Sequence, residues 1–161
     1  QIQSLKTPII EKTIFKSCKI KRDVIQKDEK EKEIRKILNF GHTFAHAFEA
    51  SLNFSKKLNH GEAVILGIKV ALKFSLINKN LIKKDYDLIL KHLRMSNIPH
   101  DIKKHFSRKD VNRIISFMLI DKKNFSNKIN LVLLKKIGLP LINQQFGKIY
   151  LSTFLKRELS N

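Results

Sequence analysis

The spacing of apolar residues along the chain predicts a succession of helices. Residues 8–27 and 83–97 carry apolar side chains at intervals of three and four, as on one face of a helix. Residues 62–76 are apolar around most of the helix, which is typical of a buried helix. Further helices are expected over residues 108–120 and from near Ser152.

A different pattern near the C-terminus predicts the β structure. Residues 128–142, KINLVLLKKIGLPLI, are rich in β-forming side chains around a Gly-Leu-Pro turn, and they indicate a short hairpin. Ser107 and Asp110 have the spacing of a capping box before a helix. No linker or repeat divides the sequence, so we expect a mainly α fold with one short β-hairpin, forming a single domain over residues 1–161.

Composition places the chain among ordinary globular domains. The 161 residues include 42% hydrophobic residues, enough for a buried core. No apolar run reaches the length of a membrane span, and the first residues lack the form of a signal peptide. A single cysteine, Cys18, excludes an internal disulfide and suits a reducing compartment, so we expect a cytoplasmic protein.

The strong positive charge admits two interpretations. The formal net charge is +19, which is typical of proteins that bind a polyanion such as nucleic acid. The basic residues are mostly Lys, are scattered along the chain, and accompany many Ile, Asn and Phe, whose codons are AT-rich. This pattern favours compositional drift over selection for nucleic-acid binding. Salt-sensitive, non-specific attraction of anions is expected in either case.

Histidines and acids gather in one stretch of the chain. His42 and His46 are four residues apart and share a helix face, with Glu49 one turn further on. His60 opens the next helix, and an antiparallel return of the chain would bring it back to His42. This spacing suits a zinc site, but it also suits unrelated surface or core histidines. Glu49 or Glu62 could be a ligand, a partner of a ligand or a helix-cap charge.

The amino-acid sequence of this stretch is more specific than the spacing of its histidines alone. The motif "LNFGHTFAHAFE" followed by "HGEAV" resembles 3-dehydroquinate synthase. The preceding "SCKIKRDVIQKDEKEKEIRKILNFGH" is similar to the lead-in of that family, with a Lys, an acidic "DExE" and an Arg. Further on, "DKKN" followed by "INLVLLKKIG" is similar to the family's next segment. The resemblance therefore covers nearly the whole chain.

The resemblance implies an activity and a set of cofactors. Family members join an N-terminal Rossmann-like domain, which binds NAD, to a C-terminal helical domain with metal- and substrate-binding groups. They convert 3-deoxy-D-arabino-heptulosonate 7-phosphate to 3-dehydroquinate and phosphate, on the shikimate route to aromatic amino acids. This chain resembles the helical domain alone, because it has no Gly-rich phosphate loop after a strand. The expected partners are the sugar phosphate and the missing NAD-binding domain. A homodimer is possible.

Three histidines take roles by their position in the motifs. His42 of "GHT" and His60 of "HGE" match two ligands of the family's metal, and zinc and cobalt suit the same ligands. His46 matches the active-site histidine that binds substrate and helps to move protons.

The resemblance also assigns groups that bind the anionic substrate. Lys21, Arg35 and Asn39 match substrate-binding positions in the lead-in. One of Lys122 and Lys123 in "DKK" matches a further substrate-binding lysine, and both remain candidates. Outside the motif, each of these side chains would be read as an ordinary surface or helix-boundary residue.

The sequence departs from the family in two places. The third metal ligand of the family is a Glu on an earlier helix, and no acid here matches it, since Glu11 lies too far along the chain. Ala45 stands where the family usually has Gly. The chain also begins without Met, so we expect a piece of a longer protein or a remnant of a split gene. Alone, it should have little or no activity.

Two alternative functions follow from the same residues. Another sugar-phosphate cyclase would share the metal motif, although Lys21, Arg35, Asn39 and "DKK" fit the dehydroquinate pattern. A basic, non-catalytic helical module that binds nucleic acid would instead be indifferent to loss of His42. The sequence shows no aromatic-basic stacking motif of the kind that binds nucleic acid.

Overall fold

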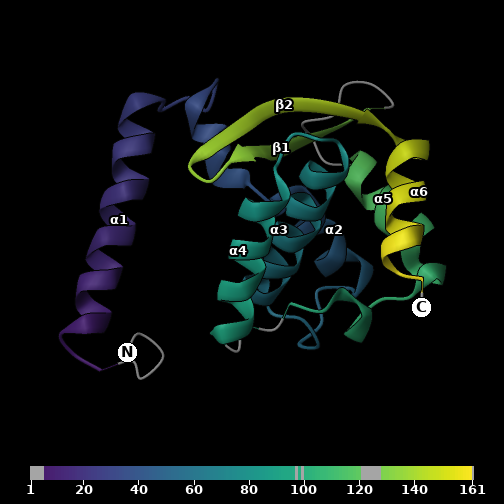
Figure 1. Cartoon of the computed structure of the whole chain (residues 1–161), viewed down its shortest axis with the longest axis horizontal. Helices are drawn as coiled ribbons and strands as arrows, with labels where there is room; N and C mark the ends of the chain where they lie inside the picture. The colour runs from purple at the N-terminus through teal and green to yellow at the C-terminus, as the bar shows by residue number, and fades with distance from the viewer. Residues whose placement is uncertain (1–5, 97, 99, 121–127, 161) are drawn as a thin grey trace. The chain divides into compact units, whose positions relative to one another are not determined.

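The fold is mainly helical with one two-stranded antiparallel sheet, as the sequence predicts (Figure 1). The chain divides into two compact units, residues 1–38 and residues 39–161. The computed structural model describes all residues except 1–5, 97, 99, 121–127 and 161.

The first unit contains one long helix, α1, over Ile9–Lys27. This helix confirms the prediction for residues 8–27, but none of its residues is buried. Phe15 and Ile20, for example, are 68% and 64% exposed. The apolar spacing thus predicted the helix correctly without marking a buried face. A 3-10 helix, η2, follows over Ile34–Asn39.

The second unit contains five α-helices and two short 3-10 turns among its described residues. Their bounds are α2 His42–Ser51, α3 His60–Ile77, α4 Lys83–Met95, η3 Ile102–Lys104, η4 Arg108–Asp110, α5 Val111–Ile120 and α6 Lys148–Glu158. The expected capping box is present, because the Ser107 N–H donates to Asp110 at 2.8 Å. Helix α6 begins at Lys148 rather than near Ser152, because the preceding strand runs directly into it through Gly147.

The predicted hairpin is confirmed and is longer than expected. Strands β1 (Lys128–Lys136) and β2 (Leu139–Gly147) pair antiparallel, with Ile129 opposite Phe146. Gly138, with φ +82°, makes the turn between them, a conformation that glycine adopts without strain.

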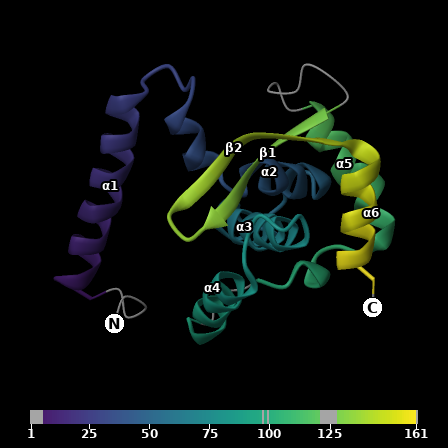
Figure 2. The same cartoon turned by 45° about the horizontal axis from the view of Figure 1, so that its top comes forward.

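Helix α3 is the centre of the second unit. Figure 2 shows α2 and α3 close to the hairpin, with α5 and α6 beside each other at one end. Because α3 contacts α2, α4 and β1, its apolar residues extend around most of the helix, as the sequence indicated. A buried link joins α3 to the sheet: the Leu134 N–H donates to Ser75 Oγ at 3.1 Å, and that hydroxyl donates to the Ala71 carbonyl at 2.7 Å.

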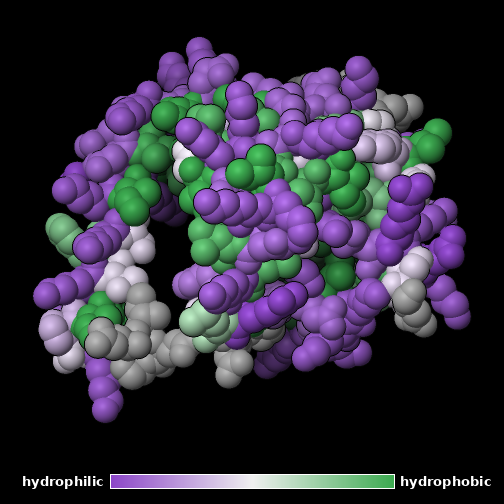
Figure 3. Space-filling model, viewed as in Figure 1, coloured by the Kyte–Doolittle hydropathy of each residue, from purple (hydrophilic) through white to green (hydrophobic). Residues whose placement is uncertain are grey.

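The surface agrees with the composition of the chain. Hydrophilic residues cover most of the face shown in Figure 3, with smaller apolar areas between them. No helix in the described part of the chain has the length and apolar content that a membrane span requires.

Glu158, the last residue of α6, has a carboxyl group whose surroundings disfavour its ionised form. Burial raises the pKa of its carboxyl above the ordinary value of 4.5, and the nearby cations Lys73, Lys69 and Lys103 oppose this shift without cancelling it. The phenol of Tyr86 lies in the same surroundings, and the charge of Glu158 raises the pKa of that phenol further. The ionised form of Glu158 therefore destabilises the fold at neutral pH.

Replacing Glu158 with Gln should raise stability at neutral pH and flatten its pH dependence. The folded protein binds this proton more tightly than the unfolded chain, so the free energy of unfolding falls as pH rises from 4.5 through the folded-state pKa. Glutamine does not ionise and escapes this fall. Thermal unfolding at pH values between about 4 and about 8 measures this pH dependence of stability. Glu29→Gln, which replaces an exposed acid, is the control. Parallel curves for the wild type and Glu158→Gln would contradict the prediction.

Candidate active site

Two glycines bring the backbones of α2 and α3 together at the start of α2. Gly41 precedes α2 with φ +82°, and a Cβ there would lie 2.5 Å from the Ile68 nitrogen. A Cβ on Gly67 of α3 would lie 2.2 Å from the Gly41 carbonyl oxygen and 3.0 Å from the Ala45 nitrogen. Gly41 is therefore a point of close approach between the two helices. The contact fixes the first turn of α2, which carries His42, against α3.

Hydrogen bonds hold the ends of both helices. The Thr43 hydroxyl donates to the Asn130 carbonyl at 3.2 Å, which joins the first turn of α2 to β1. The Asn59 N–H donates to the Glu62 carboxylate at 3.0 Å, at the start of α3. Of the roles open to Glu62 from the sequence, the structure therefore shows the helix cap.

The structure brings the three histidines of the two motifs into one cluster. The ring centres of His42 and His46 are 5.7 Å apart, and those of His42 and His60 are 5.9 Å apart. The rings of His46 and His60 are stacked at 6.2 Å. We call these three residues the histidine cluster. His46 is exposed and the His60 side chain is 60% exposed, so these two rings are open to ligands, whereas His42 is half-buried.

Two of the rings are oriented through Nδ1. His60 Nδ1 lies 3.1 Å from both carboxylate oxygens of Glu49, and His42 Nδ1 lies 3.4 Å from the Phe40 carbonyl oxygen. Because carbonyl and carboxylate oxygens accept hydrogen bonds, these contacts fit the tautomer with the proton on Nδ1, which leaves Nε2 available to a metal. Histidines that bind metals through Nε2 usually have this partner at Nδ1. Of the roles open to Glu49, the structure shows that of a partner of His60.

The residues of the cluster fit a metal as part of its ligand set. Two imidazoles on one tetrahedral zinc have ring centres roughly 5 Å apart, since Zn–N bonds are about 2.0–2.1 Å. The separation of 5.9 Å between His42 and His60 is close to this value. Among the described residues, no three His, Cys, Asp or Glu side chains form a group that could hold a metal ion.

The expected substrate-binding residues lie in different parts of the chain. Asn39 belongs to the second unit and ends η2, three residues before His42. Lys21, which is exposed on α1, and Arg35 belong to the first unit. Lys122 and Lys123 lie outside the described residues.

The turn after α1 holds Arg35 through the side chain of Asp28. The Asp28 carboxylate accepts the backbone N–H groups of Lys32, Glu33 and Arg35 at 2.9, 2.7 and 3.0 Å. Burial by itself would raise the pKa of Asp28, but these N–H groups and the Arg35 charge lower it below its ordinary value. The Arg35 guanidinium donates to the Glu29 carbonyl at 2.6 Å, so both ends of Arg35 are anchored.

Comparison with known proteins identifies the family. Residues 1–124 match the family described as 3-dehydroquinate synthase C-terminal. The chain belongs to this family. The resemblance read from the histidine motifs is therefore confirmed.

A curated relative agrees with this assignment. The chain is 59% identical over 160 residues to the 3-dehydroquinate synthase of Pelagibacter ubique (strain HTCC1062), covering 99% of this chain and 44% of the relative. It thus spans less than half the length of the curated relatives that it matches.

Two solved structures share the fold of this chain. A 2-deoxy-scyllo-inosose synthase, complexed with carbaglucose-6-phosphate, NAD+ and Co2+, has a TM-score of 0.64 and 23% identity, over 80% of this chain and 35% of that chain. The 2-epi-5-epi-valiolone synthase of Streptomyces hygroscopicus subsp. jinggangensis 5008, with NAD+ and Zn2+ bound, has a TM-score of 0.67 and 18% identity, over 84% of this chain and 36% of that chain.

Sequence patterns did not reveal one residue that shapes the packing of α2 on α3. Gly67 lies inside a strongly apolar pattern, which by itself predicts only a buried helix. A glycine in such a pattern is itself a signal of close packing, because alanine would favour the helix by about 1 kcal/mol. The partner of Gly67 is Gly41, 26 residues earlier, which no local pattern shows.

Proposed function

We propose that residues 1–161 are the C-terminal, metal- and substrate-binding domain of an enzyme that converts 3-deoxy-D-arabino-heptulosonate 7-phosphate to 3-dehydroquinate and phosphate. The observation that carries the proposal is the 59% identity to a 3-dehydroquinate synthase over 160 residues. The histidine cluster supports it, because its three residues come from the two family motifs and meet in space.

His42 and His60 are proposed to hold a divalent metal, Zn2+ or Co2+, through Nε2. The Phe40 carbonyl and the Glu49 carboxylate keep the two rings in the required tautomer and orientation. A bound metal would supply Lewis-acid polarisation of the substrate hydroxyl that NAD oxidises. The third ligand and the NAD-binding residues would belong to the part of the relatives that this chain does not match.

His46 is proposed to bind the substrate and to carry protons during the reaction. Its ring lies within the cluster but is not assigned as a ligand, so both of its nitrogens can serve the substrate. An imidazole gives and takes protons near neutral pH, which suits a step that removes a proton beside a new carbonyl.

The basic residues of the family motif are proposed to bind the two anionic groups of the substrate. The substrate carries a phosphate and a carboxylate, and lysine and arginine recognise both through charge-assisted hydrogen bonds. Lys21, Arg35 and one of Lys122 and Lys123 would supply these cations, with Asn39 as a further polar contact. The anchoring of Arg35 by Asp28 and Glu29 would reduce the entropy lost on binding.

The proposal is tested with a chimera of this chain and its 59% identical relative. In the chimera, this chain replaces the matching C-terminal part of the Pelagibacter ubique enzyme. The host is a bacterium that lacks its own 3-dehydroquinate synthase. The chimera should restore growth without aromatic amino acids, and the His42→Ala chimera should not. A chimera that is produced in soluble form and binds NAD, yet never restores growth, would contradict the proposal.

The 161-residue chain alone should show no synthase turnover. It offers two of the proposed metal ligands and has no Gly-rich phosphate loop for NAD, so the reacting groups cannot be assembled. Phosphate release from the substrate, with NAD and Zn2+ added, measures this directly, with the chimera as the positive control. Turnover by the isolated chain would show that the two proposed ligands and the supplied cofactors suffice.

A further inference from the structure

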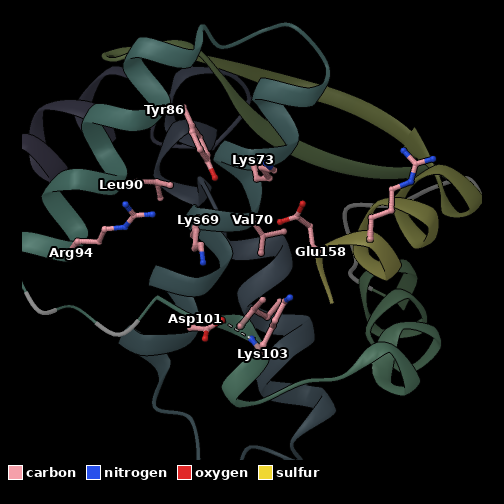
Figure 4. Close-up of a pocket in the computed structure, with 11 residues that line it drawn as sticks. Lys69, Val70, Lys73, Tyr86, Leu90, Arg94, Asp101, Lys103 and Glu158 are labelled. Atoms are coloured by element: carbon pink, nitrogen blue, oxygen red, sulfur yellow. Dashed lines mark hydrogen bonds between the residues drawn. The ribbon is translucent and has the colours of Figure 1, made fainter. Parts of the chain in front are cut away.

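A cavity of about 360 Å³ lies between α3, α4, η3 and α6 of the second unit (Figure 4). Pockets that bind small molecules usually have volumes of about 300–1,000 Å³, so this one can hold a small organic molecule. Five basic and two acidic side chains line it, together with apolar residues and Tyr86. The proposed catalytic function uses none of these residues.

The cavity is separate from the histidine cluster. Lys69, which lines the cavity, lies nine residues after His60 on α3. Nine residues correspond to about 2.5 helical turns, so the two side chains leave opposite faces of the helix. A ligand in the cavity therefore does not contact the cluster.

The sequence builds the cavity from two matching helix faces. On α3, Lys69 and Lys73 are four residues apart, and on α4, Tyr86, Leu90 and Arg94 repeat the same spacing. Side chains four residues apart share a face of a helix. Figure 4 shows the charged ends of Lys69, Lys73 and Arg94 turned toward the space between the elements. Lys73 Nζ lies 5.7 Å from the centre of the Tyr86 ring.

The two acids in the wall do not balance the cations. Asp101 already accepts the backbone N–H of Lys103 at 3.1 Å, and the ammonium of Lys103 donates to the Ser160 carbonyl. Burial raises the pKa of Glu158, which weakens it as a counter-ion. Burial also lowers the pKa of Lys69, and the charges of Asp101 and Glu158 oppose this shift without cancelling it. A bound anion would supply the missing charge.

We propose that this cavity binds a small phosphate monoester. The phosphate group would lie among Lys69, Lys73 and Arg94, because a guanidinium pairs with two phosphate oxygens while ammonium groups act as point charges. The carbon skeleton would lie against Leu90 and the ring of Tyr86, which form part of the wall. The site goes beyond the proposed catalytic function and does not depend on it.

The test compares Lys69→Met with Lys84→Met. Lys84 is exposed near the start of α4 and does not line the cavity, so both variants lose the same charge. Inorganic phosphate is titrated into the 161-residue chain at constant ionic strength, and backbone amide NMR shifts are followed. The amides of Val70 and Leu90 should shift and saturate in the wild type and in Lys84→Met. Lys69→Met should bind phosphate about tenfold more weakly or worse, as expected for a lost charged hydrogen bond.

Three results would overturn the proposal. The shifts could fail to saturate, or the two variants could weaken binding equally, and either result would mean attraction by net charge alone. The shifts could also be confined to the amides around His42 and His46, which would remove the cavity site and leave the catalytic proposal standing. If circular dichroism shows that Lys69→Met is not folded, Arg94→Gln takes its place with the same expected weakening.

Discussion

Replacing Gly67 with Ala should destabilise the second unit by about 3 kcal/mol or more. The added methyl would lie 2.2 Å from the Gly41 carbonyl oxygen and 3.0 Å from the Ala45 nitrogen. Both are backbone atoms, so no side chain can rotate to make room. Helix α2 must then move away from α3 and carry His42 with it.

Gly61→Ala provides the matched control for this substitution. Gly61 lies in the first turn of the same helix, and a Cβ there would meet no atom within 4 Å. The same methyl should leave stability unchanged or raise it by up to about 1 kcal/mol, since alanine favours a helix over glycine. Urea unfolding of the two variants measures the difference. Equal midpoints for Gly67→Ala and Gly61→Ala would show that α2 and α3 do not touch at this glycine.

Loss of a proposed ligand and loss of His46 should have different effects in the chimera. His42→Ala and His60→Ala should each weaken metal binding by about 100-fold or more, because loss of an outer partner alone costs 10–100-fold. His46→Ala should keep the metal and lower turnover by about 100-fold, the size of a general acid–base contribution.

Metal content after dialysis against a chelator, together with turnover, distinguishes these effects. The three histidines lie in one cluster, so a general disturbance of the cluster would change metal content in all three variants. If His46→Ala loses metal as readily as His42→Ala, the division of roles taken from the family motif is wrong.

Local patterns predicted those elements whose determinants are close together in the sequence. The helix over residues 62–76 and the hairpin over residues 128–142 follow from side-chain periodicity and turn residues within each segment. The meeting of His42 with His60 was also expected, because only a short loop separates their helices.

Features that depend on distant segments were beyond these patterns. The contact between Gly41 and Gly67 depends on how α2 packs on α3, and the cationic cavity needs residues from four elements. The start of α6 at Lys148 was missed although Gly147, the last residue of β2 and the N-cap of α6, separates the two elements. In helix α1, by contrast, the local apolar spacing predicted the helix correctly, although none of its residues is buried.

The most direct test of the central claim is turnover of 3-deoxy-D-arabino-heptulosonate 7-phosphate by the purified chimera, with NAD and Zn2+. Phosphate release is measured, and the carbocyclic product is identified by NMR. We expect stoichiometric phosphate and 3-dehydroquinate from the chimera and neither from its His42→Ala variant. A folded chimera that binds NAD and metal but leaves this substrate unchanged would contradict the assignment of residues 1–161 as a 3-dehydroquinate synthase domain.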